Sequence, residues 1–409
     1  MNTFADTNHK PMNSKILIII FCCVAIVEFF SVTNYKLQLS FSTYVSIAFV
    51  LLGVGLTLKL AFDEEDNIID CRNWVLMLLF WNFVTIVRGA INAESYWDWK
   101  MLIFSNIPAL LIPSAALLGC KLFAITDLLH FIRKYYFITV LLLLFIVGLP
   151  SMIMYLWTPL YFFILTYKYL PLRQQYFIFI LAFILFFADM SARSNLIRIT
   201  VAVALCLSFW WISRHQHIIS TIHKALTVLP FFLLFLGLSG TFNVFDMDSY
   251  VSSKVEIKKS DGKKENLLAD TRTLLYKECL SSMEKKGTFM FGEGGCGKYH
   301  SILFKNKQIG KNRYASEVGA LNTLLYSGII GLFLYWMVFV YASYKAINDS
   351  ANILSKLIGL FIIFRWNYFF VEDFTTYNTN FLFLWLMIGI CLSPQFRYLT
   401  DEEICDLLE

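Results

Sequence analysis

The sequence is short of charged residues, and this shortage decides the class of protein. Only 15% of its 409 residues are charged, whereas 58% are hydrophobic and 17% are aromatic. A soluble globular protein carries roughly a quarter charged residues and about half apolar ones. No water-soluble fold of this length hides so much apolar surface, so lipid must cover much of it. The composition therefore predicts an all-α, polytopic membrane protein.

Several kinds of site are also missing from the sequence. The nine cysteines form no CxxC pair and no His/Cys spacing suited to zinc, so we expect no structural metal. Nothing resembles a nucleotide site, and we expect neither a cofactor nor a nucleic-acid partner. The first apolar run, 16–32, is followed by further spans rather than by a small-residue cleavage site. We therefore expect a retained first helix and no cleavable signal peptide.

What the sequence does have is long apolar runs. A bilayer core of about 30 Å requires about 20 apolar residues in each helix that crosses it. We expect about 12 such helices, and two pairs of them, divided at Leu149-Pro150 and near Asp189-Met190, are expected to form tight hairpins. The expected spans are 16–33, 41–61, 73–90, 101–120, 133–150, 152–169, 174–190, 193–212, 224–240, 318–344, 353–371 and 379–395.

Basic residues in the short loops predict the orientation, because cytoplasmic loops carry more Lys and Arg. With the N-terminus in the cytoplasm, the inner side collects fourteen of them, and the outer short loops hold only Lys36, Arg88, Lys100 and Arg193. An even number of spans returns the C-terminus to the cytoplasm. The chain then divides into the first nine spans (1–240), a large external loop (241–316), and the last three spans with a cytoplasmic tail (317–409).

The external loop is basic, with fourteen Lys or Arg and nine Asp or Glu. A basic surface beside a membrane suits an anionic ligand such as phosphate. Residues 252–266 are nevertheless interpreted as a solvated, mobile, lysine-rich segment. Apolar residues at helical spacing predict an amphipathic helix over Leu267–Met283, with Asp270 or Thr271 as its N-cap.

Four glycines follow this helix in Phe291-Gly292-Glu293-Gly294-Gly295-Cys296-Gly297. They indicate either a plain tight turn, which is the favoured interpretation, or a nest of backbone N–H groups that receives an anion. They do not indicate a dinucleotide site, because no soluble βαβ unit precedes them. Cys279 and Cys296 share the loop, and whether they form a disulfide in an oxidising compartment stays open.

Ionisable residues at membrane depth are costly and usually face a cavity or a partner. Arg193 lies in a very short outer turn between two spans. There its fork is either positioned for an oxyanion or paired locally with Asp189. The other candidates are Arg198, one turn deeper; Glu28, interpreted as snorkelling or paired with another helix; and Glu372 and Asp373, which bind a sugar or face water.

Four short patterns occur along the chain. They are Arg88-Gly89 followed by Trp97-Asp98-Trp99-Lys100; Ser191-Ala192-Arg193-Ser194; Asp270-Thr271-Arg272-Thr273-Leu274-Leu275-Tyr276 running on to Phe291-Gly292-Glu293-Gly294; and Ser316-Glu317-Val318-Gly319-Ala320-Leu321-Asn322 leading to Gly328-Ile329-Ile330-Gly331. Together with a large loop between the ninth and tenth of twelve spans, they resemble the bacterial O-antigen polymerases and the related O-antigen ligases. Both act on sugars carried by undecaprenyl pyrophosphate.

One departure separates these two families. The ligases carry a histidine followed by Asn, Ser or Gln ahead of a G-x-x-G element. The corresponding position here is Glu317, followed by Val318, and the loop's only histidine, His300, lies well upstream. The resemblance is therefore to a Wzy-like polymerase rather than to a ligase.

The resemblance implies that a glycan on a lipid pyrophosphate is the donor and that a sugar hydroxyl on a second lipid-linked repeat is the acceptor. Cations must stabilise the departing charge, and a base must take the hydroxyl proton. We expect Glu317 to be that base, with His300 as the alternative, in a metal-independent displacement with inversion. The residues expected to bind the pyrophosphate are Arg193 and Arg272, and those expected to support substrate binding are Arg88, Arg313, Lys100 and Gly294.

Other functions stay open, namely an O-antigen ligase, a flippase or transporter of lipid-linked oligosaccharide, and a sensor. Transport is disfavoured because the two halves show no evident repeat and because a flippase has little need of a large external loop. We expect a multi-pass protein of the bacterial inner membrane that makes O-antigen or capsular or exopolysaccharide. Its expected partners are the undecaprenyl-pyrophosphate-linked donor and acceptor, membrane lipid and, where one is needed, a chain-length regulator protein.

Overall fold

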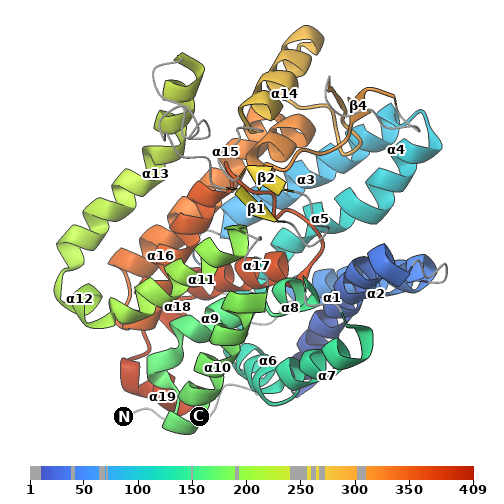
Figure 1. Cartoon of the computed structure of the whole chain (residues 1–409). Coiled ribbons are helices and arrows are strands. Elements are labelled where there is room, and N and C mark those ends of the chain that lie inside the picture. Colours follow the sequence, from blue (N-terminus) through green and yellow to red (C-terminus); the bar gives the residue numbers. More distant parts are fainter. Residues whose placement is uncertain are drawn as a thin grey trace.

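Helices make up most of the described chain, as the composition predicts (Figure 1). The structure is a computed structural model that describes residues 11–37, 42–63, 70, 72–148, 151–188, 193–239, 256–258, 264–266, 272–301 and 310–409. The first helices are α1 (Pro11–Leu37), α2 (Ser42–Ala61), α3 (Arg72–Asn92), α4 (Tyr96–Met101), α5 (Ile107–Leu111), α6 (Leu122–Phe131) and α7 (Phe137–Val147). Short π-helical or 3₁₀-helical stretches join α4 to α5, α5 to α6 and α6 to α7.

The middle of the chain contains shorter helices. They are α8 (Ser151–Leu156), α9 (Leu160–Leu165), α10 (Leu172–Ala188), α11 (Arg193–Leu207), α12 (Phe209–Arg214) and α13 (Gln216–Ser239). The expected span 152–169 is divided into α8 and α9, and Pro159 lies at the break. Proline has no N–H and clashes with the preceding turn, so it ends a helix or begins a new one.

In the described part of segment 241–316 there are one helix and two short hairpins. Strand β1 (Glu256–Lys258) pairs antiparallel with β2 (Lys264–Asn266), and β3 (Tyr299–His300) pairs antiparallel with β4 (Asn312–Arg313). Helix α14 (Arg272–Lys286) overlaps the helix expected over 267–283 and ends three residues later. Its expected N-caps, Asp270 and Thr271, lie outside the described residues. The hairpins are a small departure from an all-α fold.

The chain ends with α15 (Gly319–Asn348), α16 (Ile353–Tyr368), α17 (Thr379–Leu392), α18 (Pro394–Arg397) and α19 (Asp401–Leu408). Figure 1 shows α14, α4 and β4 together at one end of the molecule, here called the α14 end. Helix α19 lies at the opposite end, here called the α19 end. Sites at the two ends are therefore separated by the length of the bundle.

Seven helices among the described residues are long and apolar enough to cross a membrane. They are Met12–Asn34, Ser42–Ala61, Arg72–Asn92, Tyr96–Cys120, Leu122–Val147, Gln216–Leu236 and Gly319–Asn348. Two further apolar helices, α10 and α17, are shorter. These lengths and compositions are those of a multi-pass membrane protein, whereas the count of twelve spans stays a prediction.

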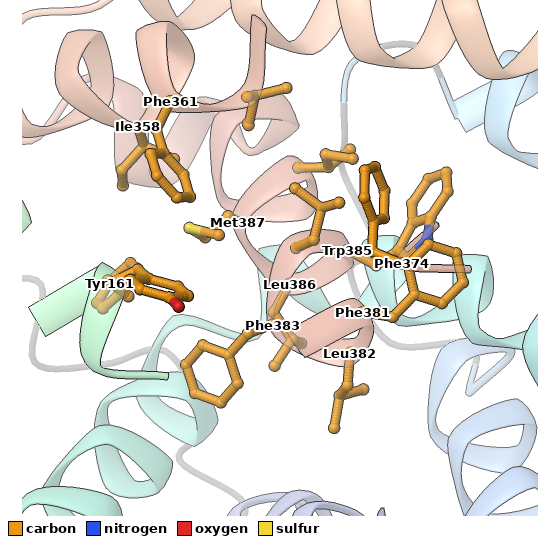
Figure 2. Close-up of a cluster of buried hydrophobic side chains, with 14 of the residues drawn as sticks. Tyr161, Ile358, Phe361, Phe374, Phe381, Leu382, Phe383, Trp385, Leu386 and Met387 are labelled. Atoms are coloured by element: carbon orange, nitrogen blue, oxygen red, sulfur yellow. The ribbon is translucent and has the colours of Figure 1, made fainter. Parts of the chain in front are cut away.

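Helix α17 lies in the centre of the bundle. All of its residues except Asn380 are buried, and a helix that is apolar all round belongs in a core. Figure 2 shows Phe381, Phe383 and Trp385 of α17 among Tyr161 of α9 and Phe361 of α16. At Gly389, an added Cβ atom would lie 2.2 Å from the carbonyl oxygen of Ala116. Glycine is therefore needed because α17 lies very close to the 3₁₀-helical stretch Ile112–Cys120, which contains Ala116.

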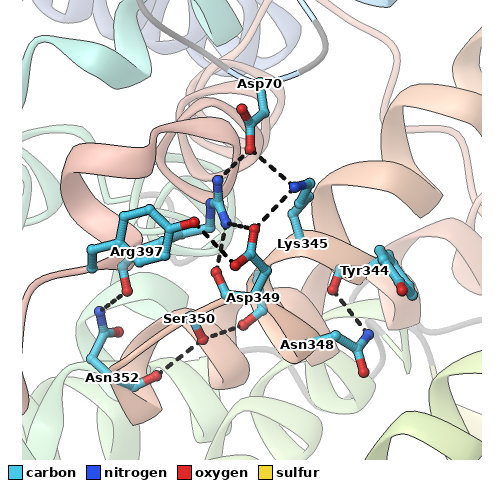
Figure 3. Close-up of polar contacts among 10 residues, drawn as sticks. Asp70, Tyr344, Lys345, Asn348, Asp349, Ser350, Asn352 and Arg397 are labelled. Atoms are coloured by element: carbon cyan, nitrogen blue, oxygen red, sulfur yellow. Dashed lines mark hydrogen bonds and ion pairs between the residues drawn. The ribbon is translucent and has the colours of Figure 1, made fainter.

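A charged cluster joins several segments at the α19 end (Figure 3). The side chain of Arg397 is fully buried and pairs with Asp70 and with Asp349, the latter at 2.7 Å. Lys345 completes the group, at 2.9 Å from Asp349 and 3.4 Å from Asp70. The hydrogen bond from Lys345, with help from Arg397, lowers the pKa of Asp349 to about 2. Two cations and two carboxylates balance one another, so this cluster is neutral.

Candidate functional site

Two arginines point into the bundle near the α14 end. Arg198 on α11 is 7% exposed, and Arg365 on α16 is 1% exposed. Asn380 on α17 lies between them. With its amide oxygen turned toward the guanidinium groups, it accepts from Arg198 Nη1 at 3.1 Å and from Arg365 Nη2 at 3.3 Å. Three helices far apart in the sequence therefore bring two like charges together around one amide.

The ion pairs of this arginine cluster do not balance, although the buried Glu28 carboxylate also lies within electrostatic range of Arg198. Glu372 is the carboxylate that pairs with it among the described residues, through Oε1 at 3.5 Å from Arg198 Nη2. Arg365 instead lies 4.2 Å from the centroid of the Phe374 ring, and Arg198 lies 5.5 Å from that of Tyr161. A buried cation without a full complement of partners is costly, so the surplus positive charge favours an anionic ligand.

The unpaired donors of Arg365 show where such a ligand would be held. Its Nε and Nη1 atoms have no hydrogen-bond partner among the described residues, and neither has Glu372 Oε2. A buried donor left without an acceptor costs about 1–3 kcal/mol. A cavity of about 10 Å³, lined in part by Thr158, Tyr161, Arg365 and Asn380, adjoins the guanidinium group. This volume admits about one water molecule, so only a single polar group or oxygen would fit without movement.

Helix α14 packs on the turn that carries Glu372. Arg272, the first residue of α14, donates from Nε to the Val371 carbonyl at 2.8 Å. Tyr276, one turn later, donates to the Phe370 carbonyl at 2.8 Å. The same turn meets the start of α15, where Asp373 N donates to the Glu317 carbonyl at 2.8 Å. Arg272 and Glu317 are thus brought to one turn, directly above the arginine cluster.

Asp373 in this turn is held by its neighbours. Its Oδ1 accepts from Thr375 N at 2.9 Å and from Thr375 Oγ1 at 2.6 Å, and its Oδ2 accepts from Asn322 Nδ2 at 2.8 Å. Burial raises the pKa of Asp373, and these hydrogen bonds partly oppose that shift. The side chain therefore fixes the turn against α15.

The other predicted catalytic residues lie farther out. Arg193 is exposed at the first residue of α11. The Glu317 side chain is 57% exposed and lies 3.6 Å from Arg313. His300 is exposed, and its backbone N donates to Ser282 Oγ at 3.3 Å. Ser282 lies ten residues along α14 from Arg272, which is about 15 Å. The structure therefore does not bring His300 to the arginine cluster.

The glycine-rich segment forms a turn whose N–H groups are already used. Glu293 N and Gly294 N donate to the carbonyls of Leu325 and Tyr326 at 2.7 and 3.0 Å, and Gly295 N donates to the Thr85 carbonyl at 3.0 Å. The plain-turn interpretation is confirmed, and the N–H of Gly294 is not available to an anion. Gly294 also has a φ of +87°, and an added Cβ would lie 2.6 Å from Gly89 N, so only glycine fits.

The turn inserts into a break in α15. Gly328 has non-helical torsions of φ 69° and ψ −171°, which only glycine adopts readily. The break leaves backbone C=O and N–H groups on both sides of Gly328 without partners in the helix, and the glycine-rich turn forms hydrogen bonds with them. In addition to the two carbonyls above, Ile329 N donates to the Phe289 carbonyl at 2.8 Å, and Trp81 Nε1 donates to the Ser327 carbonyl at 2.8 Å.

Arg88 holds this turn from α3. Its Nη1 donates to the Phe291 carbonyl and its Nη2 donates to the Gly292 carbonyl at 2.8 Å. Lys100, by contrast, is exposed, with Nζ 5.0 Å from the Trp97 ring. The aspartate of the same motif, Asp98, is fully buried and accepts from Lys298 and Tyr314 at 2.7 and 2.8 Å. Arg88 and Asp98 therefore hold the segment between α14 and α15 against α3 and α4.

The remaining sequence-based questions have structural answers. Cys279 and Cys296 are both buried thiols and do not form a disulfide. Glu28 is buried on α1, and its Oε2 accepts from Thr379 N at 2.9 Å and Thr379 Oγ1 at 2.6 Å. The interpretation that Glu28 pairs with another helix is confirmed. No group of three or more potential metal ligands occurs in the part of the chain that the structure describes.

Two residues of the arginine cluster were not predicted. Arg365 lies in the apolar run 353–371, and an arginine at that depth is itself a signal. Nothing in the sequence indicates the role of Asn380, because an asparagine at the start of a membrane span is common. No family model, curated protein or solved structure matches this chain.

Proposed function

We propose that this protein joins undecaprenyl-pyrophosphate-linked oligosaccharide repeat units into polysaccharide, as a metal-independent glycosyltransferase. The proposal places the α14 end on the periplasmic face of a bacterial inner membrane and both termini in the cytoplasm, with twelve spans. The observation that carries it is the pair of buried arginines, Arg198 and Arg365, with a surplus positive charge and unused donors. The motif resemblance supplies the substrate class.

The chemistry needs little more than charge stabilisation at the leaving group. When the sugar leaves the lipid carrier, negative charge builds on a pyrophosphate, and fixed cations in a water-poor site stabilise it. A guanidinium group can bind two phosphate oxygens at once. Arg198 and Arg365 are the deepest such groups in the cluster. Arg272 and Arg193 lie on the approach to it and are proposed to receive the pyrophosphate first.

A base must also take the proton of the acceptor hydroxyl. Glu317 stays the preferred candidate because its backbone carbonyl accepts a hydrogen bond from the turn that carries Glu372. Its side chain is exposed and close to Arg313, so an acceptor sugar reaches it from outside the membrane. His300 stays the reserve, since it lies at the far end of α14.

An apolar groove below the cluster suits the lipid chain of the substrate. It has a volume of about 330 Å³ and is lined by side chains of α11, α13 and α16, among them Val201, Leu205 and Phe364. Val201 and Leu205 follow Arg198 at helical spacing and so share its side of α11. A polyprenyl chain in this groove would carry its pyrophosphate toward Arg198.

Incubation of the purified protein with a defined lipid-pyrophosphate repeat unit tests the proposal. We expect a ladder of products, each longer by one repeat. Absence of a ladder from folded protein, with substrate intact, would contradict the proposal.

A deletion strain separates the proposed activity from the alternatives. Loss of a polymerase leaves single repeat units on the outer-membrane acceptor. Loss of a flippase strands repeats on the cytoplasmic leaflet, and loss of a ligase leaves polymer on the lipid carrier. We expect the first pattern, and either of the others would assign the chain to a different class.

A further inference from the structure

A second pocket opens at the α14 end, beside the glycine turn. It has a volume of about 220 Å³, and its lining combines α3, the end of α14 and the turn. The residues that decide its chemistry are Arg88, Asn92, Lys286, Glu293 and Lys298. It lies where α3 leaves the bilayer, because Arg88 and Asn92 belong to the last turns of that helix.

The positive charges of this pocket outnumber the negative ones. Arg88, Lys286 and Lys298 line it, and Glu293 is the one acidic side chain in the lining. The donors of Lys286 already have acceptors within the protein, because its Nζ lies within 2.9 Å of both Glu293 carboxylate oxygens and of the Lys298 carbonyl oxygen. An ammonium has three hydrogens, so Lys286 orients Glu293 and has none left for a ligand.

Arg88 and Lys298 keep donors for a ligand. A guanidinium group has five N–H bonds, and the described residues take two of those of Arg88, for the carbonyls of Phe291 and Gly292. Lys298 gives one N–H to Asp98. The remaining donors come from two cations on one pocket, an arrangement that suits a carboxylate.

The other lining groups suit hydroxyls. Thr288 lines the pocket with its other atoms, because its Oγ1 is enclosed by protein. Asn92 uses one amide hydrogen for the Glu293 carbonyl at 3.0 Å, which leaves its Oδ1 and its second hydrogen. Glu293 supplies carboxylate lone pairs. A bare phosphate would meet these acceptors unfavourably, whereas a ligand rich in hydroxyls donates to them.

We propose that this pocket binds an acidic sugar, with the carboxylate at Arg88 and Lys298 and the ring hydroxyls at Asn92 and Glu293. The pocket is of monosaccharide size and is distinct from the arginine cluster. Its use for a sugar of the repeat unit rests on the proposed function, but binding of the sugar itself does not.

Saturation-transfer NMR with the purified protein in detergent tests this, with glucuronic acid, methyl glucoside and inorganic phosphate as probes. We expect transfer to the glucuronate ring protons, weaker transfer to methyl glucoside, and no displacement by an equal concentration of phosphate. No transfer to glucuronate, or full displacement by phosphate, would overturn the proposal. Binding requires no polymerisation, so failure here and failure of the ladder assay are distinguishable.

Two variants locate the sugar. Asn92→Ala removes the Oδ1 acceptor of the pocket together with one hydrogen bond to the Glu293 carbonyl, so we expect about fivefold weaker glucuronate binding, as for one lost hydrogen bond. Arg88→Lys keeps the charge but loses the fork, and we expect a loss of about tenfold or more, with a melting curve to show that the turn stays docked. Lys285→Met is the matched control, since Lys285 is exposed on α14 and does not line the pocket. Unchanged binding in both pocket variants would refute the assignment.

Discussion

The two charged clusters of this bundle use buried arginine in opposite ways. At the α19 end, Arg397 and Lys345 face two carboxylates, so the charges balance and three chain segments are held together. At the α14 end, Arg198 and Arg365 share one carboxylate, and donors of Arg365 stay unused. A balanced cluster stabilises a fold, whereas a surplus of charge and donors calls for a ligand. The difference separates a structural arginine from a binding one without reference to sequence similarity.

The largest effect is expected from Arg397→Met. Removing this fully buried cation leaves Asp70 and Asp349 without their main partner, and breaking a buried pair costs about 3–5 kcal/mol. We expect the free energy of unfolding in detergent to fall by about that amount, measured by chemical denaturation. Arg214→Met, at an exposed position on α12, is the control and should change little. A loss below about 1 kcal/mol would show that the cluster is not structural.

Arg365→Lys is expected to act on activity rather than on stability. Lysine keeps the charge but cannot supply two parallel donors, and loss of one preorganised donor typically lowers a rate about 100-fold. We expect that decrease in the rate of ladder formation, with an unfolding curve close to that of the unmodified protein. Arg214→Lys serves as the matched control. A rate within a few-fold of normal would remove Arg365 from the site.

Glu372→Gln sharpens the comparison of charge. The carboxylate competes with an anionic ligand for Arg198, so its neutralisation should tighten binding of inorganic pyrophosphate about tenfold. Isothermal titration calorimetry measures this. Asp349→Asn, the corresponding change at the α19 end, should leave pyrophosphate binding unchanged. Equal effects of the two variants would mean that the clusters do not differ in the proposed way.

The smallest effect concerns low pH. The pKa of Asp349 is about 2 in the folded protein, below its ordinary value of 3.8. A carboxyl whose pKa is lowered by folding stabilises the fold above its ordinary pKa, and this stability is lost as the pH falls from about 4 toward 2. Because the side chain is 36% exposed, solvent screening reduces the effect to about 1 kcal/mol. Unfolding curves of Asp349→Asn should lack this part of the acid dependence.

Much of the helical framework follows from the sequence, because a bilayer demands long apolar runs. Helices α1, α2, α3 and α15 occupy expected spans, and α14 follows from its apolar spacing. Where proline interrupts a run, as between α8 and α9, length alone overestimates the continuity of the helix.

The site was only partly predictable. Arg198 and Arg272 are recognisable in the sequence as charges at the membrane boundary, but their relation to Arg365 and Asn380 depends on packing between helices 93 to 182 residues apart. The glycine turn was ambiguous for a similar reason. The sequence alone leaves its N–H groups free for an anion. In the fold, the break at Gly328 supplies the carbonyls that accept from Glu293 and Gly294, and Thr85 of α3 accepts from Gly295.

The break in α15 also makes the glycine turn between α14 and α15 part of the helix packing around α15. If the loop were cut out, the carbonyls of Leu325 and Tyr326 and the N–H of Ile329 would lose their partners close to hydrocarbon, at several kcal/mol for each group. Loop exchange between related chains should therefore fail unless the turn and the glycine of the helix travel together. The loop and the first part of α15 are in this sense a single structural unit.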